Sequence, residues 1–226
     1  MICLRNCAHS GEPGCAVPVW KTGKITNIVE KITREAFYNL YIPGCVEHYL
    51  VHIMRDHKDF VPELDFVLEL NGNIIGNIMY TKAKLMDENG RMKEVLTFGP
   101  VSILPAYQRR GYGKMLMEHS FKEAVRLGYD AIVIFGSPVN YVSRGFKSCK
   151  KYNVCIENGK FPSPMMVKEL IPNVLAGHKW IYQESDIMAV SEEQAQNYDN
   201  TLEKLEKKYL PSQDEFYIMS HSFMEG

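Results

Sequence analysis

The sequence lacks any apolar run that approaches the roughly 18 residues of a membrane-spanning helix. It also lacks a basic start followed by an apolar stretch, so we expect no secretory signal. No charge sign dominates, because 26 lysines and arginines face 27 aspartates and glutamates and are dispersed along the chain. That distribution argues against a basic nucleic-acid-binding face. We therefore expect a soluble, cytoplasmic protein without nucleic-acid or membrane partners.

Cysteine is scarce, and its spacing does not favour a metal site. Among the six cysteines, Cys3, Cys7 and Cys15 lie near His9 and could suggest a metal knot, but no C-x-x-C pair is present. Free thiols in a reducing cytoplasm are the simpler interpretation. We predict no bound metal.

Two further side-chain candidates for chemistry are set aside. His48 and His52 have the i, i+4 spacing of zinc ligands but lack the glutamate of H-E-x-x-H. Cys149 could be imagined as an acyl-carrying nucleophile, but no histidine lies beside it in sequence, so we predict structural burial.

Hydrophobic spacing predicts a mixed α/β domain in residues 24–178, after an atypical leader at 1–23 that shows no clean strand. A helix is expected from Thr26, with a stripe of Ile28, Ile32, Ala36 and Leu40. The remaining expected elements of this half are a short helix around 46–54, strands at 64–70 and 74–80 joined by an Asn71-Gly72 turn, a polar loop at 86–93, and a strand at 95–104. Gly99-Pro100 interrupts that last strand, so we expect a bulge or splay there.

The second half opens with a glycine-rich loop and a helix at 113–127, whose expected buried face includes Val125. A strand at 131–135 follows, which implies one parallel crossover, and strands at 152–156 and 165–171 come next. Residues 179–226 form an expected extension. It has a strand near 180–190, a capping box at Ser191 and Gln194, and an amphipathic helix from Ala195 to Tyr209 that ends before Pro211. This extension could cover an acceptor site or build a dimer contact, so monomer and homodimer both stay open.

The segment from Gly99 to Leu116 carries the chemistry. A strand enters a loop and the loop opens a helix, whose first N–H groups lack intrahelical partners and can bind an anion. Gly111 and Gly113 let phosphate oxygens approach the main chain, and Arg109, Arg110 and Lys114 add positive charge. The segment fits neither the nucleotide P-loop, which needs Ser or Thr after the lysine, nor the dinucleotide motif, which needs a third glycine.

The same segment resembles the Q/R-x-x-G-x-G/A signature of the GNAT superfamily of N-acetyltransferases, here Gln108-Arg109-Arg110-Gly111-Tyr112-Gly113. The preceding strand, the following helix and the Y-x-x-x-G-F ending at Tyr141 to Phe146 extend the similarity over roughly residues 26–171. The resemblance implies a GNAT-like acyl-CoA N-acyltransferase fold, with a central mixed, largely antiparallel sheet splayed at the coenzyme site and flanked by helices.

The resemblance also implies roles for particular residues. Acetyl-CoA would be the co-substrate, held by main-chain groups of Val101, Ser102 and Ile103 at its pantetheine. The pyrophosphate would be held by the segment Gln108, Arg109, Arg110, Gly111, Tyr112, Gly113 and Lys114. Asn140 and Ser143 would also contact the coenzyme. Tyr141 would protonate the departing thiolate, as its normal pKa of about 10 allows; aromatic packing beneath the coenzyme is the alternative role.

The expected reaction is direct attack of a primary amine on the thioester in a ternary complex, with an oxyanion held by N–H groups near Val101. Glu63, Asp65 and Glu94 are weak candidates for the base, and spacing does not choose among them. A non-catalytic acyl-CoA-binding sensor and an enzyme for longer acyl chains remain alternatives. The acceptor, a small molecule or a peptide amine, stays open.

Overall fold

Two β-sheets form the centre of the fold. The two arms of one long hairpin run through both sheets, and the sheets diverge where these arms pass from one to the other. The computed structural model describes residues 2–6 and 22–225, with side chains from Ile25 to Glu225. The metal knot suggested by Cys7, His9 and Cys15 lies outside the described residues, and the side chain of Cys3 is not described either. Among the described residues, no helix is both long and apolar enough to cross a bilayer.

The first sheet has four strands in the order β1-β2-β3-β6, and the second has seven in the order β8-β11-β7-β5-β4-β12-β9. The strands of the first sheet are β1 (Ile2–Asn6), β2 (Phe66–Leu70), β3 (Asn73–Ile78) and β6 (Ser102–Ile103). Those of the second are β4 (Tyr80–Asp87), β5 (Met92–Phe98), β7 (Ala131–Phe135), β8 (Lys147–Ser148), β9 (Val154–Cys155), β11 (Met165–Glu169) and β12 (Trp180–Gln183). A separate ribbon pairs β10 (Phe161–Pro162) with β13 (Phe223–Met224).

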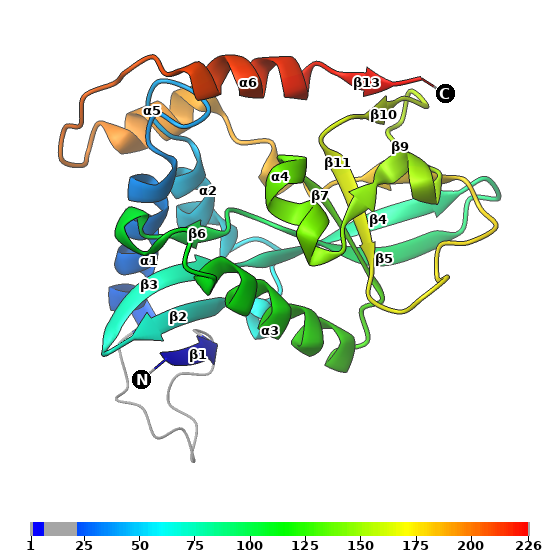
Figure 1. The fold of residues 1–226 in the computed structure, drawn as a ribbon, viewed down its shortest axis with the longest axis horizontal. Coiled ribbons are helices and arrows are strands. Elements are labelled where there is room, and N and C mark those ends of the chain that lie inside the picture. The colour runs from blue at the N-terminus through cyan, green and yellow to red at the C-terminus, as the bar shows by residue number, and fades with distance from the viewer. Residues whose placement is uncertain (1, 7–21, 226) are drawn as a thin grey trace.

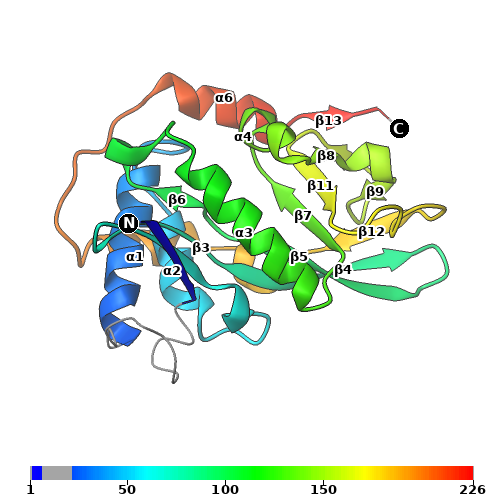
Figure 2. The same ribbon diagram turned by 60° about the horizontal axis from the view of Figure 1, so that its bottom comes forward.

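The helices cover both faces of the sheets. They are α1 (Thr22–Phe37), α2 (Glu47–Met54), α3 (Tyr112–Arg126), α4 (Pro138–Tyr141), α5 (Glu192–Asp199) and α6 (Pro211–Ser220). The helix α3 runs across one face, and α1 and α2 lie behind the other (Figure 2). Along β2, Phe66 and Leu68 belong to the core beneath α3, whereas Val67 packs with α1 and α2. The alternation expected for this strand is explained by burial on both sides.

The predicted splay is confirmed. The strands β4 and β5 pair from Tyr80↔Phe98 onwards, and β3 pairs with β6 at Gly76↔Ile103, so one hairpin is divided between two sheets. The division falls at Pro100, which has no N–H for a ladder. Before Pro100, β5 belongs to the larger sheet and forms a parallel bridge to β7, which confirms the crossover. After Pro100, β6 is an edge strand of the smaller sheet.

Several expected boundaries are wrong. The proposed polar loop at 86–93 is largely strand, because β4 runs to Asp87 and β5 begins at Met92. In β5 the outer residues Met92 and Glu94 are exposed, and in β4 the buried Leu85 follows the exposed Lys84, so the outer halves show no continuous apolar run. On α1 the buried apolar residues are Ile25, Val29 and Ile32. Of the expected stripe only Ile32 is buried, whereas Ile28, Ala36 and Leu40 are half-buried. On α3 the expected core residue Val125 is exposed.

The leader holds an edge strand that the sequence did not reveal. Residues Ile2–Asn6 pair antiparallel with β2 as β1. The stretch from Cys15 to Trp20, which the sequence offers as a possible first strand, lies outside the described residues. A five-residue strand has little periodicity of its own, so pairing with β2 decides its conformation.

The C-terminal residues are built differently from the expected strand and long helix. The strand β12 lies inside the larger sheet, between β4 and β9. Ser191 caps α5 as predicted, accepting from the Gln194 N–H at 3.3 Å, but α5 ends at Asp199. The expected helical stripe through Leu205 and Tyr209 is wrong. Pro211 is the first residue of α6 rather than a stop signal, a position that suits its fixed φ.

Two charge clusters, one buried and one only partly buried, attach α5 to α1 and α2. Asp199 accepts from the Arg34 Nε at 2.7 Å and lies 3.2 Å from the His48 Nε2. Glu30 contacts His52 at 3.0 Å and accepts from the Tyr198 hydroxyl at 2.6 Å. The two histidines therefore face different carboxylates instead of forming a metal-ligand pair.

Burial decides the state of two groups that could otherwise be reactive. It lowers the pKa of His48 to about 4, so this imidazole is neutral at pH 7. It raises the pKa of the Cys149 thiol to about 11, and the Cys149 Sγ lies 3.6 Å from the Pro162 carbonyl oxygen. Cys149 is a buried thiol, as expected, and is not activated for nucleophilic attack.

Candidate active site

The start of α3 is an uncapped row of N–H groups. Gly111 is the N-cap in the left-handed region at φ 86°, Arg109 precedes it at φ 60°, and no side chain caps the helix. The first helical bond of this end runs from the Met115 N–H to the Gly111 carbonyl. The N–H groups before Met115 have no partner within the helix, and together with the positive helix dipole they suit an anion.

Close packing between the loop and β6 holds this arrangement in place. The Gln108 side chain donates to the Ile103 carbonyl at 3.0 Å, so it braces the loop instead of extending toward a ligand. A Cβ on Gly76 would lie 2.4 Å from the Ile103 Cδ1 and 2.7 Å from the Ser102 carbonyl oxygen. Glycine is therefore required at 76 for β3 and β6 to meet.

The outer edge of β6 carries main-chain groups that face the gap between the sheets. Leu104 N–H donates to the Ile75 carbonyl, and in an antiparallel ladder this fixes Val101 and Ile103 as the residues that point away from β3. The Ser102 hydroxyl donates to the Thr33 hydroxyl at 2.9 Å on the α1 side, and the main-chain groups of Ser102 face β3 rather than the gap.

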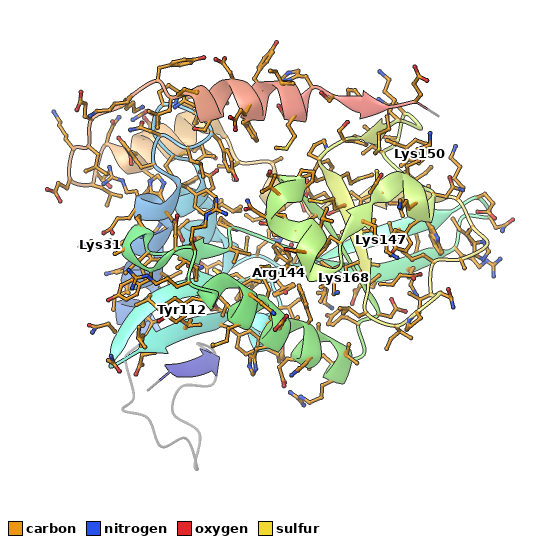
Figure 3. The ribbon with its side chains drawn as sticks, in the orientation of Figure 1. Lys31, Tyr112, Arg144, Lys147, Lys150 and Lys168 are labelled. Atoms are coloured by element: carbon orange, nitrogen blue, oxygen red, sulfur yellow. The ribbon has the colours of Figure 1, made fainter. Side chains whose placement is uncertain are left out.

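Positive charge surrounds the α3 start and continues beside α4. Arg109 and Arg110 are exposed, and Lys114 lies 3.7 Å from Glu118 on the surface of α3. Figure 3 shows Arg144, Lys147 and Lys168 grouped next to α4, where the Lys168 Nζ donates to the Arg144 carbonyl at 2.8 Å. These residues do not form a group in the sequence, because they come from three separate elements.

Tyr141 lies where the two sheets part. Its ring packs 5.8 Å from both Phe98 and Phe146, and a Cβ on Gly136 would lie 2.6 Å from its Cε2. Burial, with a smaller contribution from Tyr41, raises the pKa of Tyr141 above its usual value, so the phenol stays protonated. Asn140 and Ser143, on the same short turn, are exposed.

The three candidate bases lie elsewhere. Asp65 is buried in an ion pair with Arg55 at 2.9 Å. Glu94 lies 3.5 Å from Lys82, and Glu63 and Glu94 both act on the pKa of Tyr129, which follows the C-terminal end of α3. That end is about 20 Å from the α3 start at 1.5 Å per residue. The structure does not bring these carboxylates to Tyr141.

A different carboxylate has the properties of a base. The Tyr182 hydroxyl donates to Glu184 at 3.4 Å and also interacts with the side chain of Thr97, two residues before Gly99. Desolvation beside Tyr182 raises the pKa of Glu184 to about 7, although the residue is exposed at the surface; the carboxylate of an unperturbed glutamate titrates near 4.3. Glu184 lies outside the motif region, so spacing could not indicate it.

An apolar pocket of about 400 Å³ opens at the end of β7, next to Tyr141. It lies beneath α6, the helix that crosses the upper side of the molecule in Figure 1. Its lining residues are Tyr41, Phe135, Gly136, Ile156, Pro162, Pro164, Phe216, Met219, Ser220 and Phe223. The site thus combines an anion-binding helix start, an open strand edge, a protonated phenol and a hydrophobic pocket.

Comparison with known proteins agrees with this combination. A family profile described as the acetyltransferase (GNAT) family matches residues 34–147, half of the chain. The solved GNAT family N-acetyltransferase YhbS from Escherichia coli, in complex with CoA, is similar at a TM-score of 0.64 and 17% identity, over 84% of this chain and 91% of that one. A GNAT family acetyltransferase from Brucella melitensis, in complex with acetyl-CoA, gives 0.58 and 19%, over 83% and 98%. No curated protein matches.

The expected mixed α/β fold, with its splayed sheet flanked by helices, is the fold of these structures. The family profile spans the end of α1, the splayed strands, the glycine loop, α3 and the Tyr141 turn. The chain therefore belongs to the acetyltransferase (GNAT) family of acetyl-CoA-dependent N-acyltransferases.

Proposed function

We propose that this protein transfers an acetyl group from acetyl-CoA to a primary amine by direct attack within a ternary complex. The observation that carries the proposal is the uncapped α3 start, which follows the open edge of β6 where the smaller sheet separates from the larger one. The pyrophosphate binds the amides between Arg109 and Lys114. The pantetheine binds the outward main-chain groups of Val101 and Ile103. The thioester then lies between Val101 and Tyr141.

The reaction forms one bond and breaks one. The amine nitrogen adds to the thioester carbon, and the carbonyl oxygen becomes an oxyanion that the Val101 N–H stabilises. The C–S bond then breaks, and the departing thiolate takes the proton of Tyr141. The extra proton on the nitrogen is lost and returns through water to the Tyr141 phenolate. The products are the acetylated amine and CoA. The raised pKa of Tyr141 supports this role, because an acid must be protonated at working pH.

Tyr141→Phe is expected to lower kcat by roughly tenfold, since a positioned acid contributes strongly but water replaces part of its effect. The ring is retained, so its packing on Phe98 and Gly136 and the KM for acetyl-CoA stay unchanged. Steady-state thiol release measures both constants. An unaltered kcat would assign Tyr141 to packing alone.

Glu184 is the base that this geometry supports best. An acceptor ammonium has to lose a proton before it attacks. The Tyr182 hydroxyl contacts Thr97 on β5 and donates to the Glu184 carboxylate, so it connects the two residues. Because the pKa of Tyr182 is raised well above its usual value, its hydroxyl is protonated, and it passes this proton to Glu184 as it accepts one from the ammonium.

Glu184→Gln is expected to remove the inflection near pH 7 from the profile of kcat/KM and to lower the value at pH 7.5 by about tenfold or more. The sign follows from the base role: the rate rises as pH rises through the pKa of about 7, where the carboxylate becomes ionised. Glu192→Gln, at an exposed carboxylate on α5, is the control. An inflection that persists in Glu184→Gln would exclude Glu184 as the base.

Thiol release from acetyl-CoA against a panel of primary amines tests the proposed function directly. Release that depends on both substrates, with one acetylated amine formed per CoA, is the expected result. CoA binding without release for any amine would instead support the non-catalytic binding module.

A further inference from the structure

The pocket under α6 is almost entirely apolar. Four of its ten lining residues are aromatic, Ser220 and the Tyr41 hydroxyl are its polar side-chain groups, and none of the ten is Asp, Glu, Lys, Arg or His. Aromatic side chains stack with other rings as well as excluding water. The pocket volume of about 400 Å³ is in the range of small-molecule sites.

The pocket lies next to the residues proposed to react. Gly136 lines the pocket on one side and touches the Tyr141 ring on the other, where a Cβ would come within 2.6 Å of the ring. Tyr41 also lines the pocket and is close enough to influence the Tyr141 pKa. The ring of Phe135, another lining residue, packs 6.1 Å from Tyr182, the partner of Glu184. The pocket wall therefore contacts Tyr141 through Gly136 and Tyr182 through Phe135.

The helix α6, which covers the pocket, is anchored at both ends. At the start of α6, the buried Asn39 side chain accepts from the Lys208 N–H at 3.0 Å, and the Asn39 carbonyl accepts from the Nε2 of Gln213, in the first turn of α6, at 2.9 Å. After α6, β13 pairs with β10, and the Ser163 N–H donates to the Ser222 carbonyl at 2.9 Å. Phe216 stacks on Tyr41 with ring centroids 4.7 Å apart. Hydrogen bonds, strand pairing and ring stacking therefore fix α6 over the pocket.

We propose that the acceptor is a primary amine that carries an uncharged aromatic or similarly bulky apolar group, and that this group binds in the pocket beneath α6. This inference rests on the proposed function and names its substrate class. A polyamine or an amino sugar would place additional ammonium or hydroxyl groups against carbon atoms, and the ten lining residues offer no carboxylate to compensate. The neighbouring Tyr182–Glu184 pair favours an amine over an acyl chain as the occupant, because it provides a route for the amine proton.

The test compares 2-phenylethylamine, ethylamine and spermidine in the thiol-release assay, with acetyl-CoA as donor. The wild-type protein is expected to prefer 2-phenylethylamine to spermidine by at least about tenfold in kcat/KM. Met219→Trp fills the pocket and is expected to raise the KM for 2-phenylethylamine by about tenfold or more, from the apolar burial that is lost. The KM values for ethylamine and for acetyl-CoA should stay the same.

Ile218→Trp is the matched control, because Ile218 precedes Met219 on α6 and is 66% exposed. It should leave all three KM values unchanged. If Met219→Trp does not fold, Met219→Phe replaces it. The inference is overturned if spermidine is preferred. It is also overturned if Met219→Trp and Ile218→Trp act alike, or if Met219→Trp impairs hexanoyl-CoA as donor instead of the aromatic amine, since the pocket would then hold the acyl chain.

A separate readout distinguishes failure of this inference from failure of the proposed function. Calorimetric binding of 2-phenylethylamine to the CoA-loaded protein does not require turnover. Binding that Met219→Trp weakens, without thiol release from any amine, would keep the pocket assignment and reject the catalytic one. Thiol release from other amines without detectable binding of 2-phenylethylamine would do the reverse.

Discussion

Gly111→Ala is expected to weaken CoA binding by on the order of a hundredfold or more. A Cβ at this position would meet no protein atom within 4 Å, so it enters the open space in front of the α3 amides. If the pyrophosphate occupies that space, the methyl group displaces it from about two charge-assisted hydrogen bonds, each worth about 1.5–3 kcal/mol. Isothermal titration with CoA measures the change.

The chain offers a matched control at the other end of the same helix. Gly128 has φ 93° against 86° for Gly111, and a Cβ there also meets nothing within 4 Å. Both alanine variants therefore carry the same backbone strain of roughly 1–2 kcal/mol, and only Gly111→Ala should lose CoA. Equal affinity in the two variants would mean that the phosphates do not bind at the α3 start, and the proposed function would lose its main support.

Asp199→Ala is expected to destabilise the protein by about 3–5 kcal/mol, because it leaves the guanidinium of Arg34 without its buried counter-charge. The side chains of Arg34 and His48 are only 9% and 0% exposed, so water cannot replace the lost carboxylate. For a chain of this size the loss corresponds to a fall in Tm of roughly 10 °C. Differential scanning calorimetry measures it.

Two further variants separate the ion pair from the helix that carries it. Asp199→Asn keeps an oxygen that accepts from the Arg34 Nε, so its loss of stability should be smaller. Glu193→Ala removes an exposed carboxylate from the first turn of α5 and should cost at most about 1 kcal/mol. A similar small loss in all three variants would show that Arg34 and Asp199 are effectively solvated and do not anchor α5.

The sequence by itself determined the parts of this protein that are local. The glycine loop, the following helix and the break at Gly99-Pro100 each depend on neighbouring residues, since a φ of 86° needs glycine and Pro100 cannot donate to a ladder. The resemblance carried by residues 108–113 and by Tyr141 to Phe146 sufficed to predict the family. The strand alternation at 66–70 likewise appears in the chain, because its two faces meet two different layers.

The tertiary structure alone decided what the site contains around that loop. Glu184 becomes a candidate base only because Tyr182 and Thr97 lie beside it. Phe135 and Phe216 line one pocket only because the Asn39 side chain binds the main chain at Lys208, which places α6. The same hydrogen bond to Asn39 holds residues 200–210 in an irregular conformation, instead of the helix that their apolar spacing favoured. These contacts join residues far apart in the chain, and their energy depends on distance and burial, which residue spacing along the chain does not encode.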